Sequence, residues 1–343
     1  MHPSVGVKWL AKGLVAGAAC IYSLTSAQAE VTTVTIGETF GLTHLASYVV
    51  ADEHLIEAAA QARGLPPIKV DFKQVSNGNV VADLLLSGSV NVASSGVVPF
   101  LSLADKVKRL QPIKGIAALA GCNDFLMTTD PNITSIKDFK DTDRIAMTDV
   151  AATTWAILLQ IEAAKLYGWD NRNRFTPLSV PMANGEAAAA MLSGRTEVKS
   201  HMTMLPYTAV ERQSGHIRAI LSSKDVVGTP ITAAMVFTTV KFHDENPSVY
   251  AAIADAYEQA EQFINEHPRE AAEIYIRHEP QKEGVAGVLK MMQPDQPDEL
   301  VFTTTPQGVK AFADYMARAG LIKEAAPSWG DFFFENLHDK QGS

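Results

Sequence analysis

The chain has 343 residues, of which 47% are hydrophobic and 20% are charged, and its net charge is −9. A chain of this length can bury one or two sizeable hydrophobic cores. The acidic balance argues against a general affinity for nucleic acid or for anionic membrane surfaces. It does not exclude an anionic ligand, because a local site can oppose the field of the whole protein.

The N-terminal residues have the pattern of a secretory signal peptide. Lys8 and Lys12 precede an apolar run over residues 14–24, and a small-x-small cleavage site ends at Ala29. The run is too short for a comfortable membrane span. We therefore expect residues 1–29 to be removed during general export to the periplasm, which leaves a net charge of −11 because two lysines are lost.

The two cysteines indicate whether the exported protein has a lipid anchor or a disulfide. Small residues at positions 17–19 precede Cys20, and a lipid-attachment box prefers a large aliphatic residue there, so we expect no lipid anchor. Cleavage leaves Cys122 as the single cysteine of the mature chain. No internal disulfide is then available, and the core must hold the fold.

Strand and helix patterns alternate along most of the chain, as judged from apolar periodicity and β-branched residues. The predicted strands cover residues 31–37, 68–72, 90–93, 116–119, 125–128, 144–148, 176–180 and 198–199. The predicted helices cover residues 45–63, 79–87, 153–167, 186–192, 246–266, 268–277, 283–292 and 306–319. This alternation of strands and helices indicates an α/β protein whose sheets are mixed and mainly parallel, with helices on their faces.

Two stretches of the chain resemble copies of one element. Residues 83–100 and 190–207 each run from a helix end through Leu-Ser-Gly and a short strand to a polar loop that ends in proline and an aromatic residue. The glycine suits a left-handed helix end, and the proline suits a helix start. The repeat predicts two similar lobes with facing loops, although short repeats also arise by chance in such a chain.

A division into two lobes follows from this repeat. We expect lobe I to combine residues 30–121 with residues 229–343, including the C-terminal helices, and lobe II to comprise residues 122–228. The chain then crosses twice between the lobes, and two crossings make a hinge beside an interlobe cleft.

Motifs of catalysis and metal binding are missing from the sequence. It contains no Gly-x-Ser-x-Gly, no phosphate loop, no dinucleotide fingerprint after the first strand and no His-Glu-x-x-His. The histidines of the mature chain are scattered, and none is spaced from another His or Cys as metal ligands are. The sequence therefore predicts a protein that is not an enzyme and that has no cofactor and no metal.

Polar loops at the ends of predicted strands form the candidate ligand site. Open α/β sheets bind ligands there, and the helix N-termini that follow attract anions. Ordinary helix capping is an alternative role for the same hydroxyl and carboxylate groups. The candidate ligand-binding residues are Thr43, His44, Ser94, Ser95, Gly96, Asp124, Thr153, Thr154, Trp155, His201, Met202 and Tyr207.

Several of these residues also fit a second role. His44 and His201 suit either ligand contact or ordinary packing. Trp155 and Tyr207 suit either the wall of an apolar pocket or the core. Asp124 lies at the first predicted crossing, which suits a hinge, a cleft floor or an ordinary turn.

Four segments carry a resemblance to a known family. They are Ile-Gly-Glu-Thr-Phe at 36–40, Leu-Leu-Ser-Gly-Ser-Val-Asn-Val-Ala-Ser-Ser-Gly at 85–96, Ile-Thr-Ser-Ile-Lys-Asp-Phe-Lys-Asp-Thr-Asp-Arg-Ile-Ala-Met at 133–147 and Asn-Glu-His-Pro-Arg-Glu-Ala-Ala-Glu at 265–273. With them the chain resembles periplasmic substrate-binding proteins of the nitrate/sulfonate/taurine ABC-transporter type, in the thiamine-pyrimidine synthase-like superfamily. The resemblance implies a two-lobed, hinge-closing fold of the second periplasmic-binding class and delivery of a ligand to a membrane permease.

The sequence departs from the family pattern at two places. Asp-Thr-Asp at 141–143 replaces the usual Gly-Lys turn of the run I-x-S-x-x-D-L-K-G-K-x-I-A, and this concerns a surface turn only. The candidate ligand loops match no substrate signature. The resemblance therefore implies a fold and a role but does not imply which ligand is bound.

Three functions fit these observations. The first is a monomeric solute-binding protein of an ABC importer, which captures a small organic anion such as a sulfonate, nitrate, taurine or an aromatic acid by lobe closure. The second is an enzyme on the same scaffold, as in the pyrimidine-synthase-like relatives, which needs Cys122 or Lys199 in the cleft. The third is a ligand-sensing partner of a receptor, which the sequence does not distinguish from the first.

Overall fold

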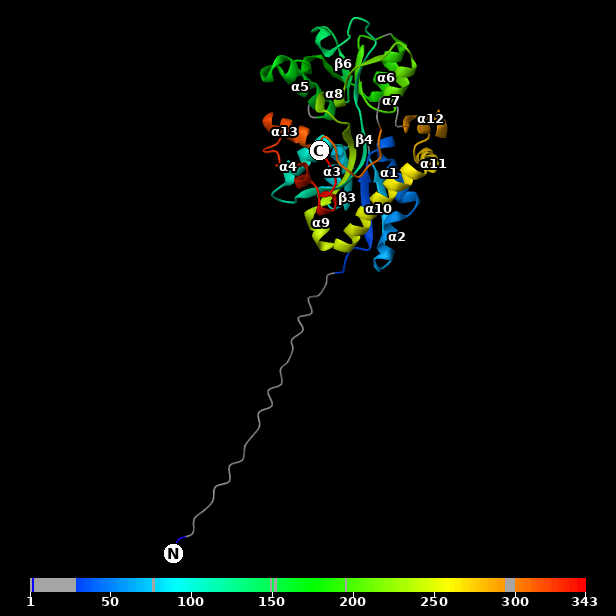
Figure 1. The fold of residues 1–343 in the computed structure, drawn as a ribbon, viewed down its shortest axis with the longest axis vertical. Helices are drawn as coiled ribbons and strands as arrows, with labels where there is room; N and C mark the ends of the chain where they lie inside the picture. The colour runs from blue at the N-terminus through cyan, green and yellow to red at the C-terminus, as the bar shows by residue number, and fades with distance from the viewer. Residues whose placement is uncertain are drawn as a thin grey trace.

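The computed structural model describes residue 2 and residues 29–343, except residues 76–77, 149, 151–152, 195 and 294–299. The predicted signal peptide lies outside the described residues, apart from residues 2 and 29. Two five-stranded sheets, each covered by helices, lie one above the other (Figure 1). The α/β architecture expected from the alternating pattern is confirmed.

The first sheet has the strand order β2-β1-β3-β10-β4. Strands β1 (Thr33–Glu38), β2 (Lys69–Gln74) and β3 (Val92–Ser95) run parallel to one another. Strand β10 (Ile231–Thr239) is antiparallel to β3 and also to β4 (Ile113–Cys122). The late strand β10 thus joins the two halves of this sheet.

The second sheet repeats this arrangement in the order β7-β6-β8-β5-β9. Strand β6 (Ile145–Met147) is parallel to β7 (Ser179–Pro181) and to β8 (Ser200–Thr203), whereas β5 (Phe125–Thr128) is antiparallel to β8 and to β9 (Arg218–Ser222). The strands of the two sequence copies, β3 and β8, each occupy the middle of their sheet. Among the described strands, half of the pairings in each sheet are parallel, so the sheets are mixed.

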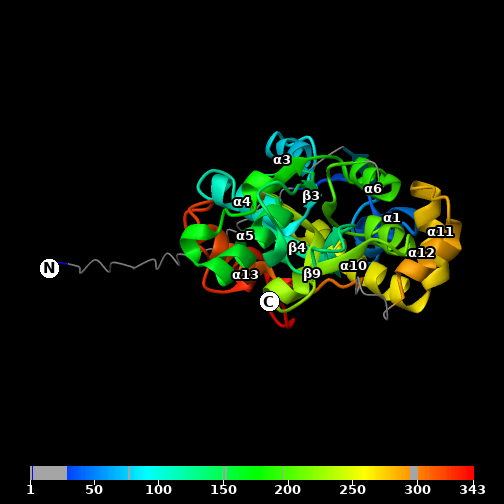
Figure 2. The same cartoon turned by 90° about the horizontal axis from the view of Figure 1, so that it is seen from above.

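Helices cover the sheets on two sides, and Figures 1 and 2 show the same separation. One group comprises α1 (Leu45–Asp52), α2 (Leu55–Ala62), α10 (Pro247–Glu266), α11 (Pro268–His278) and α12 (Gly284–Met291). The other group comprises α3 (Gly78–Leu86), α4 (Val97–Val107), α5 (Thr154–Tyr167) and α13 (Val309–Arg318). The remaining helices are α6 (Asn184–Ser193), α7 (Tyr207–Gln213), α8 (Ser223–Val227) and α9 (Val240–Glu245).

Each group of helices encloses its own hydrophobic core. The first core packs α1, α2, α10 and α11 against the first sheet. The longest helix, α10, begins with Pro247 in its first turn and buries Val249, Ile253, Tyr257 and Ile264, which recur at helical spacing. The second core runs from α3 and α4 through α13 to α5 and the second sheet, so one continuous core joins the two sheets on that side.

The structure differs from the sequence expectations at particular elements. The helix predicted over residues 45–63 is two helices, because His54 adopts a left-handed conformation with φ of 51° between α1 and α2. The strand predicted at 198–199 begins at Ser200. The predicted helix starts at Pro99 and Pro206 correspond to the first turn of α4 and to the residue before α7, although the bounds of these helices were not predicted. Strands β9 and β10 were not predicted, because they pair with strands that are distant in the chain, and the short helices α8 and α9 were not predicted either.

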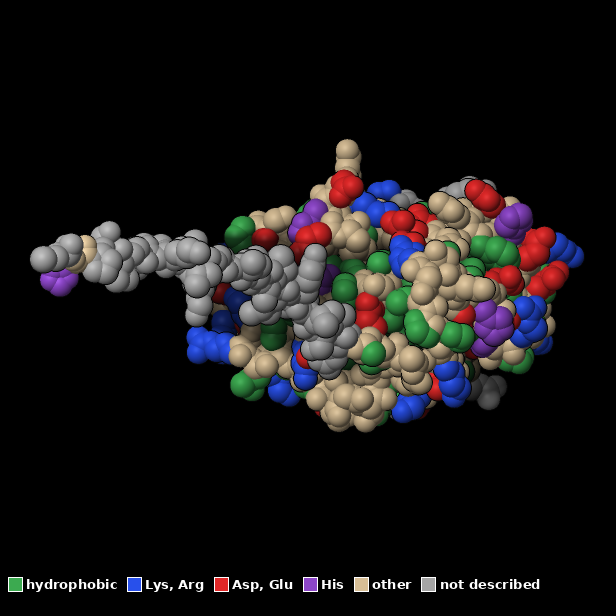
Figure 3. All heavy atoms as spheres, turned by 90° about the horizontal axis from the view of Figure 1, so that it is seen from below, with side chains coloured by type: hydrophobic (Ala, Val, Ile, Leu, Met, Phe, Trp, Pro, Cys, Tyr) green, Lys and Arg blue, Asp and Glu red, His purple; other side chains and the backbone are tan. Residues whose placement is uncertain are grey.

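The chain passes from one sheet to the other at two places. Asn123 and Asp124 join β4 to β5, and residues 228–230 lead from α8 back into β10. These passages lie beside the boundaries that the sequence suggested, while the division into whole lobes stays a prediction. In Figure 3 acidic and basic side chains are interspersed over the face seen from below. Within the described residues no helix has the length and apolar character of a membrane span.

Candidate functional site

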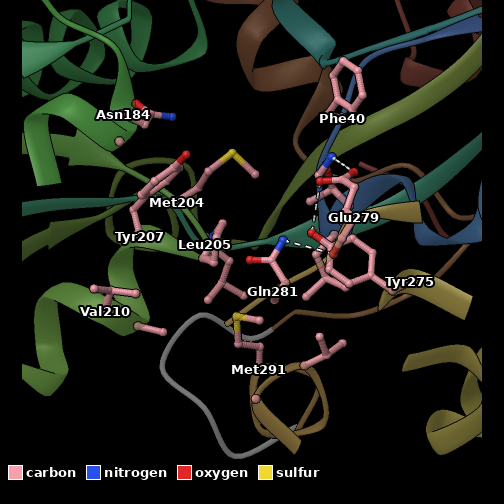
Figure 4. A pocket seen from close by; sticks show the side chains of 18 of the residues that line it. Phe40, Asn184, Met204, Leu205, Tyr207, Val210, Tyr275, Glu279, Gln281 and Met291 are labelled. Atoms are coloured by element: carbon pink, nitrogen blue, oxygen red, sulfur yellow. Dashed lines mark hydrogen bonds between the residues drawn. The ribbon is translucent and has the colours of Figure 1, made fainter. Parts of the chain in front are cut away.

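A cleft of about 1010 Å³ opens between the two sheets. One wall is formed by the loop after β1, residues 39–44, and by the C-terminal end of α11. The opposite wall is formed by the start of α6 and by α7, and α12 lies below them (Figure 4). Loops and helices that follow strands of both sheets therefore line one cavity large enough for a small organic molecule.

The predicted site residues divide into two groups. Thr43, His44, Gly96 and Tyr207 line the cleft. The other eight lie outside its described lining, namely Ser94, Ser95, Asp124, Thr153, Thr154, Trp155, His201 and Met202. Ligand contact by any of the twelve stays a prediction.

Strand boundaries explain the position of four of these residues. Ser94 and Ser95 belong to β3 and pair with β10, so they are not in a loop. His201 and Met202 likewise belong to β8 and pair with β5. All four are buried. The sequence placed both strands two residues too early, because β-branched residues are less frequent at the true strand ends.

Three further predicted residues have structural partners. The Thr153 hydroxyl accepts a hydrogen bond from the backbone N–H of Ala156 and so caps α5, which was the alternative role for such a residue. The Trp155 indole N–H donates to Asp124 at 2.6 Å, and both side chains are buried. Asp124 also bonds to Ser223 through its backbone N–H at 3.0 Å, which ties the first passage to α8.

An internal carboxylate occupies the first wall of the cleft. Glu279 Oε1 accepts a hydrogen bond of 2.6 Å from the backbone N–H of Gly41, which precedes the short helix Leu42–His44. The same carboxylate accepts hydrogen bonds from the hydroxyls of Tyr48 and Tyr275. Gly41 has φ of 122°, which favours glycine. The N–H predicted to attract an anion is thus taken by a side chain of the protein itself.

A second acid lies behind this wall. Glu38, at the end of β1, is buried, and one of its carboxyl oxygens, Oε2, has no hydrogen-bond partner in the described part of the chain. Burial raises the pKa of Glu38 to about 8, a hydrogen bond with Ser47 opposes this rise, and the charge of Glu279 adds to it. Glu38 is therefore a neutral acid at pH 7.

His44 brings no positive charge to the first wall. Its Nε2 lies 3.0 Å from the Thr39 hydroxyl, and its Nδ1 lies 3.3 Å from the Ser94 hydroxyl. Burial lowers the pKa of His44 to about 4, so the imidazole is neutral at pH 7. With Glu279 beside it, this wall is negative overall.

The second wall has the opposite polarity. Helix α6 begins at the cleft with Asn184 and Gly185, and no side chain caps its first turn. Arg212 of α7 also lines the cleft, with its guanidinium 4.3 Å from the ring centroid of Phe125. A helix N-terminus and a guanidinium both attract anions. The polar part of this wall is therefore suited to an anionic group.

Apolar side chains line the rest of the cleft. Phe40 is 54% exposed at its edge, and Figure 4 shows Met204, Leu205, Val210 and Met291 around the cavity. Such a lining suits a ligand with an apolar body. Phe40 lies in a segment that carried the family resemblance, but Asn184, Arg212, Glu279 and Met291 were missed, because no local pattern marks them.

The described residues include no group of three or more His, Cys, Asp or Glu side chains arranged to hold a metal ion. Cys122 is buried and does not line the cleft. Lys199 forms an ion pair with Asp130 and is also absent from the described lining.

Comparison with known proteins places the chain among related folds. A family model described as NMT1/THI5 like matches residues 61–271. No curated protein matches the sequence significantly. The solved structures that are similar include the periplasmic aliphatic sulphonate binding protein SsuA from Escherichia coli, with a TM-score of 0.66 at 13% identity over 90% of this chain and 99% of that one.

Two further structures extend this comparison. The alkanesulfonate-binding protein SsuA from Xanthomonas axonopodis pv. citri, bound to MOPS, has a TM-score of 0.61 at 15% identity and covers 86% of this chain and 96% of its own. The periplasmic nitrate-binding protein NrtA from Synechocystis PCC 6803 has a TM-score of 0.59 at 16% identity, with coverage of 88% and 84%. These matches confirm the expected periplasmic-binding-protein fold.

Proposed function

The chain belongs to the NMT1/THI5-like family, and from this membership we propose that it is the extracytoplasmic solute-binding component of an ABC importer. It binds a small organic anion in the cleft between two lobes and delivers it to a membrane permease. The observation that carries the proposal is a single cleft of about 1010 Å³ lined from both sheets. Similar folds occur in proteins described as sulphonate- and nitrate-binding.

The polarity of the two walls orients the ligand. Glu279 covers the Gly41 N–H and makes the first wall negative, so an anionic group is repelled there. The start of α6 and Arg212 attract it on the second wall. The apolar body then lies along Met204 and Met291. This reverses part of the expectation from sequence, which placed anion-binding groups on both sides.

Lobe closure is part of the same proposal. We take residues 30–121 with 229–343 as lobe I and residues 122–228 as lobe II, joined by the passages at Asn123–Asp124 and at 228–230. Ligand contacts from both walls favour the closed state, because the contacts with the second wall add to the binding energy only when the lobes close. A periplasmic location, a monomeric state and a permease partner belong to this proposal.

A ligand panel tests the proposal. The mature protein is screened by thermal shift with alkanesulfonates, nitrate, taurine, aromatic acids and neutral pyrimidines, and hits are measured by calorimetry. We expect an organic anion to raise the melting temperature, because a ligand that binds only the native state stabilises it. Native mass spectrometry of protein from the periplasm identifies any ligand that co-purifies. Binding of cationic compounds alone, with no anion, would contradict the proposal.

The enzyme hypothesis has less support from the site. It needs a reactive cysteine or lysine in the cleft, whereas Cys122 is buried outside it and Lys199 pairs with Asp130. We propose that bound ligand is released unchanged. Recovery of an intact ligand after prolonged incubation is the expected result, and a new mass for the released compound would support an enzyme instead.

A further inference from the structure

We propose that His201 is a positioning residue for the ligand site, although it does not line the cleft. Together with Glu211 it orients the side-chain amide of Asn184 so that the amide NH2 faces the cleft. That NH2 group then donates a hydrogen bond to the anionic group of the ligand. The proposal rests on the proposed function and adds a residue that decides which head groups are accepted.

Three elements bring these side chains together. His201 lies in the middle strand β8, Glu211 on α7 and Asn184 at the start of α6. His201 Nδ1 lies 2.6 Å from Glu211 Oε1, and both side chains are 0% exposed. His201 Nε2 lies 3.4 Å from Asn184 Oδ1, a long hydrogen bond. These contacts therefore connect a buried carboxyl group to a residue of the cleft wall.

The positions of the protons decide which groups donate and which accept in these hydrogen bonds. The amide oxygen of Asn184 can only accept, so His201 Nε2 carries a hydrogen. One further proton lies between Nδ1 and Glu211 Oε1. Whether it is on nitrogen or on oxygen, the His201–Glu211 pair has no net charge.

The reversed amide is disfavoured by burial. If the NH2 group of Asn184 donated to Nε2, the ring hydrogen would be on Nδ1, and Glu211 would either be a carboxylate or carry a proton on Oε2. The carboxylate would give the pair a net charge of −1 with both side chains fully buried, and an isolated buried charge is costly. Glu211 Oε2 has no hydrogen-bond partner among the described residues, so neither a charge nor an O–H group there would be stabilised.

The orientation of Asn184 adds a hydrogen-bond donor to the second wall. With Oδ1 directed to His201, the nitrogen of the amide faces the cavity, as Figure 4 shows. The uncapped start of α6 and the Arg212 guanidinium add further donors on the same wall. A wall rich in donors favours groups that only accept, such as sulfonate, carboxylate or nitrate, over amides and amines.

A measurement on the ligand-free protein tests the orientation. Nitrogen-15 NMR of the His201 ring reports which ring nitrogen carries hydrogen. We expect a protonated Nε2 in the wild type, with His201→Gln used to assign the signal. An unprotonated Nε2 would overturn the proposal, whatever the ligand proves to be. This test is independent of the proposed function.

A second experiment measures the effect on affinity with butanesulfonate as the probe. Asn places its amide nitrogen near the position of Nδ1, whereas Gln places it near Nε2. We therefore expect His201→Asn to weaken binding about tenfold, the size of one lost hydrogen bond to a charged group, and His201→Gln to retain most of the affinity. Binding of the uncharged butanesulfonamide by the wild type is expected to be weaker.

Coupling separates positioning from a purely structural role. In an Asn184→Ala background, His201→Asn is expected to have no further effect on butanesulfonate affinity, even if it lowers the melting temperature. Additive losses, or equal losses in the Asn and Gln variants, would overturn the proposal. If the wild type binds no anion at all, the proposed ligand class fails, and the NMR result alone decides the role of His201.

Discussion

Glu279 accepts a 2.6 Å hydrogen bond from the backbone N–H of Gly41, a residue 238 positions earlier in the chain. This contact occupies the N–H group of the loop after β1 that would otherwise be available to an anion. It also leaves a negative side chain in the cleft that Arg212 lines as well. The contact therefore decides both the polarity of the wall and the orientation of the ligand.

Removal of this charge is expected to strengthen anion binding. Glu279→Gln keeps an oxygen that accepts from Gly41 but removes the negative charge, so affinity for an organic anion should rise about two- to fivefold through weaker repulsion across the cleft. Calorimetry with the best anion of the panel measures this. Glu283→Gln is the control, since Glu283 also lines the cleft but is exposed. Weaker binding by Glu279→Gln would show that Glu279 contacts the ligand favourably.

Arg212 is expected to carry much of the affinity for the anionic group. Arg212→Met keeps an apolar stem over Phe125 but removes the guanidinium, and the Kd should rise about tenfold or more through loss of a charge-assisted hydrogen bond. Lys290→Met, on the exposed side of α12, is the matched control and should change the Kd less than about threefold. Equal effects of the two substitutions would mean that only the overall positive charge matters.

Stability should fall with rising pH because of Glu38. Burial raises the pKa of Glu38 to about 8, while its ordinary value is 4.5. Between these values the folded state holds a proton that the unfolded state lacks, so the free energy of unfolding decreases as the pH rises from about 4.5 to 8. The slope from this group is at most about 1.4 kcal/mol per pH unit. Urea denaturation at a series of pH values measures it.

The variant Glu38→Gln isolates this contribution. A glutamine resembles the neutral acid, so the variant should lose the slope and become more stable than the wild type near pH 8. His44 acts in the opposite sense, because burial lowers its pKa to about 4 and its contribution is lost as the pH falls from 6.5. The comparison is therefore made between the two proteins at each pH. Parallel curves for both would mean that Glu38 is ionised in the folded protein.

Helix α13 is expected to hold the two sheets together on the side away from the cleft. The Arg318 guanidinium lies 3.9 Å from the Trp169 ring centroid, and the Tyr315 ring lies 5.5 Å from the same ring. Trp169→Ala should lower the free energy of unfolding by about 2 kcal/mol through lost aromatic and cation–π contacts. Tyr315→Phe removes one hydrogen bond to Gln160 and should cost about 1 kcal/mol. Chemical denaturation measures both, and wild-type stability of the Trp169 variant would refute the role of this contact.

The sequence carried enough information for the architecture. The predicted strand at residues 125–128 coincides with β5, and the predicted helix at 246–266 differs from α10 by one residue. Both elements have a local signal, namely a short apolar run or a long helical periodicity. The repeated Leu-Ser-Gly element also located β3 and β8, the middle strands of the two sheets. Strand β10 was missed, because it is recognisable only by its pairing with β3 and β4.

The sequence predicted only part of the candidate site. Thr43, His44, Gly96 and Tyr207 line the cleft because polar loops at strand ends face a cleft in this kind of fold. His201 was named for a loop but lies inside β8, since a shift of two residues in the strand boundary moves the side chain from the loop into the sheet.

Local patterns of apolar residues thus determined that the chain is an α/β protein with two related halves. Apolar periodicity is a local pattern of a few residues, so it can be recognised in the sequence without knowledge of the tertiary structure. Only the tertiary structure decided that Glu279 accepts a hydrogen bond from Gly41, that His201 connects Glu211 to Asn184, and that Arg212 lines the same cleft. These contacts join residues from separate elements, and their geometry exists only once both sheets and their helices have packed.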